Sequence, residues 1–221
     1  MRNITLYAIA LLCLFACKKK DEVTSCFTAS RTSVELGEEI LFTDCSEHAT
    51  SYEWDFGDKA AADVYSFHSK DTESTEAEPT YTYDRPGTYS VSLTTKGTES
   101  PEITATQSIT VATISQSDIV GTWRLTRRIG YDSFYNEESN SVRDQVWIFS
   151  SDNTVLEDTA LFRNDWDWTM GSNAKFTLSN DSSGYTTDYY VVKFFNDEMI
   201  LRDVESSAKL WFDDYHFTKL D

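Results

Sequence analysis

The feature that most constrains the fold is a long series of short segments in which apolar and polar residues alternate between turn signals. In the segment that ends at Leu93, for instance, Tyr89 and Val91 also stand at alternate positions. A period of two places such apolar side chains on one face of a β-strand. Helix-favouring runs are scarce, whereas Thr, Val, Tyr and Phe are common, which also favours β structure. We therefore expect an all-β fold.

The first half of the chain predicts a β-sandwich. With 221 residues, of which 14% are aromatic, the chain is long enough for two domains of about 100 residues, each with a packed core. A series of short strands joined by turns is typical of sandwiches. The expected strands of this half are Cys26–Ser30, Glu39–Thr43, Ser51–Phe56, Pro79–Tyr83, Thr88–Leu93 and Ile103–Val111.

The stretch SYEWDFGD, Ser51 to Asp58, interleaves acidic and aromatic residues. Carboxylates beside aromatic rings could form a sugar-cleaving site, or the stretch could be only a strand followed by a turn. On a strand, Glu53 and Asp55 share one face, whereas Gly57 and Asp58 begin the turn. The aromatic residues share the other face, which we expect to point into the core: Tyr52, Trp54 and Phe56. This separation favours the structural interpretation.

Three motifs in the same order resemble the PKD (polycystic kidney disease-type) repeat, an immunoglobulin-like β-sandwich. They are Tyr52–Asp58, Ser74–Tyr83 and Pro86–Leu93, and the resemblance covers residues 25–112. Lys59 stands where the family usually has Gly, and Ala60–Asp71 is an insertion after the third strand. We interpret the insertion as a surface excursion or, alternatively, as a contact site.

Two cysteines remain as a pair in this domain once the N-terminal segment is set aside. Cys26 lies on the first expected strand and Cys45 just past the second. Because these strands should be neighbours and disulfides persist in exported proteins, we predict a Cys26–Cys45 disulfide.

The second half, residues 117–221, predicts an up-and-down barrel. Short links between successive strands favour antiparallel neighbours, and eight strands can close and so remove their exposed edges. The expected strands are Ile119–Ile129, Asp144–Phe149, Thr154–Arg163, Trp166–Met170, Ala174–Ser179, Tyr185–Phe195, Met199–Val204 and Lys209–Thr218.

Three motifs of this half resemble small bacterial lipocalin-like domains. They are Ile119–Leu125 with its Gly-x-Trp, Val146–Val155 and Trp166–Trp168. The resemblance implies an eight-stranded barrel, and lipocalin relatives bind small apolar molecules. Aromatic side chains could instead fill so small a barrel. If a cavity exists, the candidate lining residues are Trp123, Trp147, Trp166, Trp168 and Tyr190.

The N-terminus predicts a lipid anchor. Arg2 and the short apolar run from Ile4 to Ala16 precede Cys17 and a charged segment, which resembles a bacterial lipoprotein signal. Residues 1–16 would be the signal peptide and 17–24 a tether lipidated at Cys17, because several acyl chains hold a protein stably on a membrane. We expect a location in the outer membrane, facing outside.

No motif points to catalysis, a metal or a cofactor. The formal net charge of −18 argues against nucleic acid as a partner, because phosphate binding needs a basic surface. The stretch Asp165–Trp168 could form a sugar platform or a metal-binding carboxylate pair, but on a strand we expect its aspartates to face water and its tryptophans to point inward. We predict a non-catalytic binding protein whose partner is a small apolar ligand or an envelope protein. The alternatives are a glycan-binding surface protein and, third, a hydrolase with carboxylates from distant strands.

Overall fold

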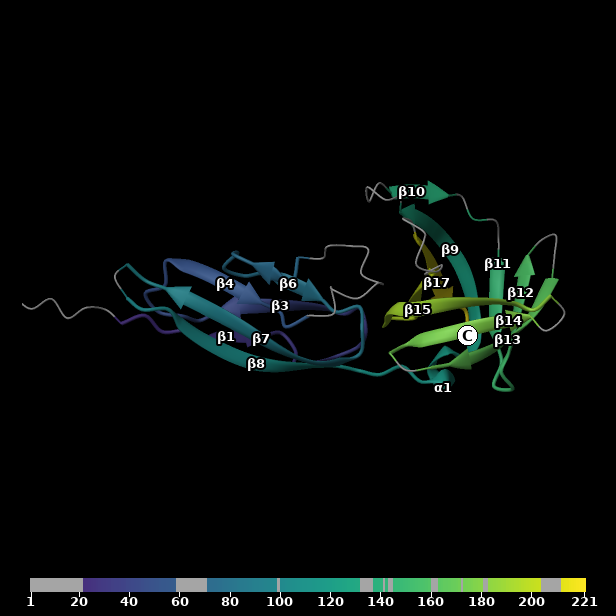
Figure 1. The fold of residues 1–221 in the computed structure, drawn as a ribbon, viewed down its shortest axis with the longest axis horizontal. Coiled ribbons are helices and arrows are strands. Elements are labelled where there is room, and N and C mark those ends of the chain that lie inside the picture. The colour runs from purple at the N-terminus through teal and green to yellow at the C-terminus, as the bar shows by residue number, and fades with distance from the viewer. Residues whose placement is uncertain are drawn as a thin grey trace, which may run out of the picture.

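The computed structural model is an all-β molecule with one short helix (Figure 1). It describes residues 22–58, 71–98, 100–131, 137–140, 142, 145–159, 163–171, 173–180, 183–203 and 212–221. The expected signal peptide, Cys17 and nearly all of the Ala60–Asp71 insertion lie outside these residues. Within the described part, no helix is long and apolar enough to cross a membrane.

The N-terminal half is a sandwich of two sheets. One sheet has the order β1 (Phe27–Ala29), β3 (Glu39–Asp44) and β6 (Thr80–Thr82). The other has the order β2 (Ser33–Val34), β8 (Ile103–Val111), β7 (Gly87–Lys96), β4 (Ser51–Asp55) and β5 (Glu73–Ser74). The β2–β8 pair is parallel and the other pairs are antiparallel. All six expected strands are present. Two further strands, β2 and β5, were not expected and have two residues each.

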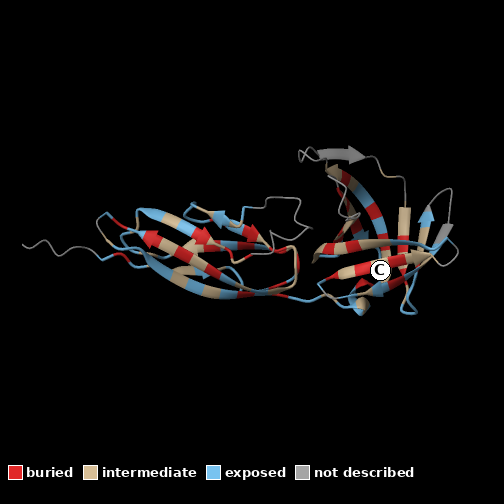
Figure 2. Cartoon of the chain, in the orientation of Figure 1, coloured by how far each residue is buried: buried red, intermediate tan, exposed pale blue. Residues whose placement is uncertain are grey.

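Aromatic side chains form the core between the two sheets. The Trp54 ring on β4 lies 5.1 Å from the ring of Phe27 and 5.7 Å from that of Phe42, both on the opposite sheet. Trp54 and Phe56 are buried, as the alternation predicts, whereas Tyr52 is only partly buried. The strands show this alternation as bands of buried and exposed residues (Figure 2).

Asp58 does not make the local turn hydrogen bond that the sequence suggests. It is buried, and its Oδ2 accepts a hydrogen bond of 3.0 Å from the Tyr81 hydroxyl. The local turn bond is made instead by Asp55, whose Oδ1 accepts from the Gly57 N–H at 2.7 Å. The stretch is therefore a strand and a turn, and its last carboxylate is part of the core.

The disulfide prediction is confirmed. Cys26 and Cys45 are bonded, with their Cα atoms 4.9 Å apart, next to the ends of the paired strands β1 and β3. The Cys45 N–H also donates to the Cys26 carbonyl at 3.0 Å, so the crosslink continues the strand ladder.

The C-terminal half is a closed antiparallel barrel. Its order is β9 (Gly121–Tyr131), β11 (Gln145–Phe149), β12 (Thr154–Thr159), β13 (Arg163–Met170), β14 (Lys175–Asn180), β15 (Tyr185–Phe195), β16 (Glu198–Asp203) and β17 (Phe212–Lys219). Pairing of β17 with β9 closes the eight strands, as predicted. A ninth strand, β10 (Glu137–Asn140), pairs with the end of β9 only. The one-turn helix α1 (Gln116–Ile119) precedes β9 and was not expected.

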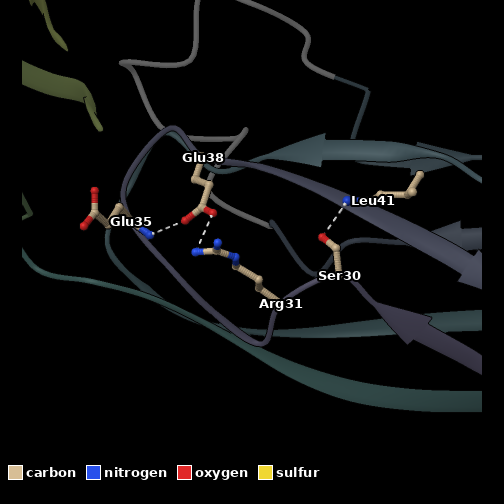
Figure 3. A network of polar contacts seen from close by, with 5 residues as sticks. All are labelled: Ser30, Arg31, Glu35, Glu38 and Leu41. Carbon is tan, nitrogen blue, oxygen red and sulfur yellow. Dashed lines mark hydrogen bonds and ion pairs between the residues drawn. The ribbon is translucent and has the colours of Figure 1, made fainter. Parts of the chain in front are cut away.

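The turn before β3 brings the sandwich against the barrel. The Phe194 N–H of β15 donates to the Leu36 carbonyl at 2.8 Å, and only residues 112–115 separate β8 from α1. The Glu38 carboxylate holds the turn, because it accepts the Glu35 N–H at 3.1 Å and pairs with Arg31 at 3.2 Å (Figure 3). The two halves therefore touch through backbone as well as through their short connection.

Candidate functional site in the barrel interior

The strand register assigns every barrel side chain to the inner or the outer face, since neighbours across a pair share a face. One half of the interior is filled by aromatic rings. Trp147 on β11 and Tyr189 on β15 stand on opposite sides of the ring of eight strands, yet their ring centroids are 6.0 Å apart. The buried aromatic residues of this half are Trp123, Trp147, Phe149, Trp168, Phe176, Tyr189 and Phe217. At this level the barrel is packed rather than hollow.

Four of the five predicted lining residues face inward. Of the four tryptophans, Trp166 alone is only partly buried, and it makes an edge contact with the Tyr185 ring at 6.0 Å. Tyr190 needs correction, because it lies on the outer face of β15 and its neighbour Tyr189 points inward. That the inward tryptophans bind a ligand stays a prediction.

The other half of the interior is polar, and none of its residues was predicted from the sequence. Arg128 on β9 and Asp213 on β17 form an ion pair with 2.6 Å between Nη2 and Oδ2. The Arg128 guanidinium also lies over the Tyr215 ring, 5.3 Å from its centroid. Tyr215 is the cross-strand neighbour of Arg128, so all three side chains share the inner face.

Two further carboxylates face each other across this half. Glu157 on β12 is the cross-strand neighbour of Trp147 and accepts a hydrogen bond from the amide of Gln145. Asp203 on β16 is paired across the strands with Tyr189 and with Asp213. Because β12 and β16 are four strands apart in a ring of eight, Glu157 and Asp203 project from opposite walls.

The carboxylates of Glu157 and Asp203 contribute to the raised pKa values of Tyr189 and Tyr215. Burial, followed by the nearby Tyr215, Asp203 and Glu157, raises the pKa of Tyr189 well above its usual value. For Tyr215, burial is again the largest cause, and the pKa rises to about 12 although Arg128 opposes the rise. Both phenols therefore keep their protons at neutral pH, where they can donate hydrogen bonds.

Solvent reaches the polar half but not the aromatic half. The side chains of Arg128 and Asp213 are 42% and 25% exposed, whereas Phe149 and Trp168 are at most 1% exposed. Trp147 lies at the boundary and is 5% exposed. Its Nε1–H has no hydrogen-bond acceptor in the described part of the protein. The polar half of the interior, defined by Arg128, Gln145, Glu157, Asp203, Asp213 and Tyr215, is thus open to solvent above a closed aromatic floor to which Tyr189 belongs.

A groove on the sandwich surface is a second candidate. It has a volume of about 560 Å³ and lies over β4, β5 and the end of β7, with five acidic residues, Lys96 and a single aromatic residue, Tyr52, along it. No three His, Cys, Asp or Glu side chains among the described residues lie close enough together to hold a metal ion. The barrel interior has the more specific arrangement of groups.

The comparisons with known proteins concern mainly the N-terminal half. Residues 26–111 match the family model described as "PKD domain". These residues form a PKD domain. The match agrees with the sandwich topology and with the three motifs that resemble this repeat. The family match does not include the barrel. No curated protein matches the chain.

Solved structures similar to the chain include two PKD domains. The PKD1 domain of Vibrio anguillarum Epp is 25% identical, with a TM-score of 0.32, and the match covers 42% of this chain and 96% of that one. The PKD1 domain from the Vibrio cholerae metalloprotease PrtV is 28% identical, with a TM-score of 0.31, over 42% and 99%. A structure of carbohydrate-binding modules from the β-sandwich superfamily is 15% identical, with a TM-score of 0.35, over 90% and 92%. Scores this low support no conclusion about ligand or activity.

Proposed function

We propose that this chain is a lipid-anchored binding protein of the bacterial cell envelope, non-catalytic, with the PKD domain as spacer and the polar half of the barrel as binding site. The likeness of the barrel to lipocalin-like domains belongs to the same proposal. The ligand site would then lie at the solvent-open end, where lipocalin-type barrels of eight strands have room for one small ligand.

The proposed binding role rests on the difference between the two halves of the barrel interior, one lined by aromatic and the other by charged side chains. Inward-facing charges lose hydration, so a barrel that served only as a scaffold would be more stable with apolar side chains in both halves. This barrel instead places one guanidinium and three carboxylates on the inner face of four strands, next to solvent. Functional sites are where such costly groups are kept.

A glycan is the second candidate ligand. Trp166 and the 49% exposed Tyr185 present aromatic surface near the open end, where sugar rings could stack. A third candidate, hydrolysis, would use the facing pair Glu157 and Asp203 as acid and base.

The binding role can be tested with the full chain and a panel of small polar molecules that contains sugars, amino acids and amines. Saturation-transfer NMR should detect at least one binder whose signal is lost in Arg128→Ala and kept in Arg124→Ala, an exposed arginine of the same strand. No binder, or binding that both variants keep, would contradict the proposed site. Appearance of a product would favour the hydrolase.

Anchoring rests on the sequence around Cys17 and has its own test. The wild-type protein should partition into the membrane fraction, and Cys17→Ala should move it to the soluble fraction. Cys13→Ala is the matched control, because Cys13 lies within the expected signal peptide and its loss should leave the protein on the membrane. If Cys17→Ala stays with the membrane, the lipid anchor is wrong.

A further inference from the structure

We infer that the barrel binds, where its polar half meets the aromatic floor, a small uncharged molecule with a carbonyl oxygen on an apolar ring or chain. The inference rests on the proposed function and names the ligand class of the same site. It follows from hydrogen-bond donor atoms that meet at this level of the barrel and have no acceptor among the described residues. They belong to Trp147, Tyr189, Tyr215 and Arg128.

The indole of Trp147 is an exception among the buried tryptophans. Trp54, Trp123 and Trp168 each donate their Nε1–H to a backbone carbonyl, at 2.8, 2.8 and 3.3 Å. The Nε1–H of Trp147 is buried and has no acceptor in the described part of the protein, not even the carboxylate of its cross-strand neighbour Glu157. Because a buried donor without a partner is costly, a ligand that supplies an acceptor here would bind favourably.

The tyrosines of the barrel interior differ from those of the PKD domain in the same way. In the PKD domain, the hydroxyls of Tyr81, Tyr83 and Tyr89 donate to a carboxylate or a backbone carbonyl, at 3.0, 2.7 and 2.8 Å. The hydroxyls of Tyr189 and Tyr215 donate to no group that the structure describes. Burial is the largest cause that raises the pKa of both, so each phenol keeps its proton at neutral pH and is available as a donor.

These donors lie side by side. The Tyr189 ring makes edge-to-face contacts with Trp147, at 6.0 Å between centroids, and with Tyr215, at 5.8 Å. The guanidinium of Arg128 lies over the Tyr215 ring, 5.3 Å from its centroid, and binds Asp213 through Nη2. Its buried Nε has no acceptor among the described residues. One small molecule can therefore meet several of these donors at once.

The donors determine the chemistry of the ligand. Asp213 already neutralises the Arg128 guanidinium at 2.6 Å, so this cation needs no anionic ligand. Burial, which keeps negative charge off the two phenols, also opposes a carboxylate in the same place. An ammonium group has only donors and cannot pair with them, whereas a carbonyl oxygen accepts two hydrogen bonds and carries no charge. The rest of the ligand would pack on the aromatic floor, where Trp147 and Tyr189 are 5% and 8% exposed, and is therefore apolar.

Ring compounds that differ in one group test the inference. Cyclohexanone carries the carbonyl, methylenecyclohexane has the same shape without oxygen, and cyclohexylamine and cyclohexanecarboxylate are charged. In an NMR titration of the full chain at about pH 7, both charged compounds stay ionised. We expect cyclohexanone to bind at least about tenfold more tightly than each of the others. It should also move the Trp147 indole proton signal downfield, as a new hydrogen bond does, and Trp147→Phe identifies this signal by its loss.

Matched variants locate the effect. Tyr215→Phe and Trp147→Phe should each weaken cyclohexanone about tenfold and leave methylenecyclohexane unchanged. Tyr190→Phe is the control, because it removes the same hydroxyl from the outer face of β15 and should change neither affinity. Tyr215 is only partly buried, so its variant provides the test if circular dichroism shows that Trp147→Phe does not fold.

The outcomes separate the inference from the proposed function. Equal binding of cyclohexanone and methylenecyclohexane, or tighter binding of either charged ring, overturns the carbonyl ligand and leaves the proposed binding site in place. Absence of cyclohexanone binding overturns the inference as well, and the polar panel with Arg128→Ala decides separately whether the site binds at all. An unchanged cyclohexanone affinity in the folded Tyr215→Phe and Trp147→Phe variants also overturns the inference.

Discussion

At the scale of single residues, the most informative contact is between Asp58 and Tyr81. Asp58 is 6% exposed, and its carboxylate accepts a hydrogen bond of 3.0 Å from the Tyr81 hydroxyl inside a core of stacked rings. Burial, followed by the Asp58 charge, raises the pKa of Tyr81. The phenol therefore remains the donor throughout the physiological range, and the pair is a buried charge-assisted hydrogen bond.

Removal of either partner should destabilise the PKD domain. Asp58→Ala leaves the buried Tyr81 hydroxyl without this acceptor, and we expect a loss of about 1–3 kcal/mol in the free energy of unfolding. Urea unfolding followed by the NMR signal of the Trp54 indole N–H, which belongs to the PKD domain's own tryptophan, measures it. A double-mutant cycle with Tyr81→Phe should give a non-zero coupling energy.

The control for this cycle is Glu53→Ala, which removes an exposed carboxylate from the same stretch. It should change stability by no more than about 0.5 kcal/mol. Additive effects of Asp58→Ala and Tyr81→Phe would show that the bond contributes nothing of its own.

Periodicity predicted Trp54 and Phe56 in the core but not Asp58 beside them. An alternating pattern identifies the apolar face of a strand, but it says nothing of a carboxylate that follows the strand and meets a partner 23 positions away. The choice of Tyr190 over Tyr189 failed for a related reason. Both are tyrosines, so only the register with β14 and β16 decides which one faces inward.

At the scale of elements, the strands were predictable because each one has its own alternation and turns. The exceptions are too short to show a period: β2 and β5 have two residues each and α1 has one turn. The polar half of the barrel was hidden for another reason. Strand β9 carries a bulge opposite His216 and Phe217, so Leu125 and Arg128 both face inward although they are three positions apart. A strict period of two would place Arg128 outside.

The disulfide is the element-scale feature with the clearest energetic consequence. It joins the ends of β1 and β3 across 19 positions in the sequence. In the chain-entropy model, closing a loop of this size stabilises a domain by roughly 3 kcal/mol. The Cys26→Ser, Cys45→Ser double variant should therefore lower the urea midpoint of the Trp54 transition and leave the barrel transition in place.

Reductant provides the control for that prediction. Dithiothreitol should shift the wild-type Trp54 transition to the position of the double variant and should not shift the variant further. A barrel transition that moves by the same amount would mean that the crosslink stabilises more than its own sandwich.

At the scale of the whole molecule, the contact between the two halves decides whether the PKD domain moves independently of the barrel or is fixed to it. Phe194 lies in β15 beyond the end of its pairing with β14, so its N–H is free to meet the Leu36 carbonyl. Beside it, Gly37 approaches the backbone of Lys193 so closely that a Cβ would lie 2.9 Å from the Lys193 Cα. Together with the short connection of residues 112–115, this packing should hold the two halves as one body.

Gly37→Ala tests this arrangement. The new methyl would collide with the Lys193 backbone and separate the two surfaces, and it would add strain because Gly37 has φ +80°. Gly184→Ala is the matched control, because Gly184 also has positive φ, at +65°, but its Cβ would meet nothing within 4 Å. We expect ¹⁵N relaxation to give one rotational correlation time for both halves in the wild type and in Gly184→Ala. In Gly37→Ala the PKD domain and the barrel should tumble with two shorter, different times. If the wild type already shows two times, the PKD domain moves independently and the Leu36 contact does not fix it. If Gly37→Ala still shows one time, the connecting residues alone hold the two halves together.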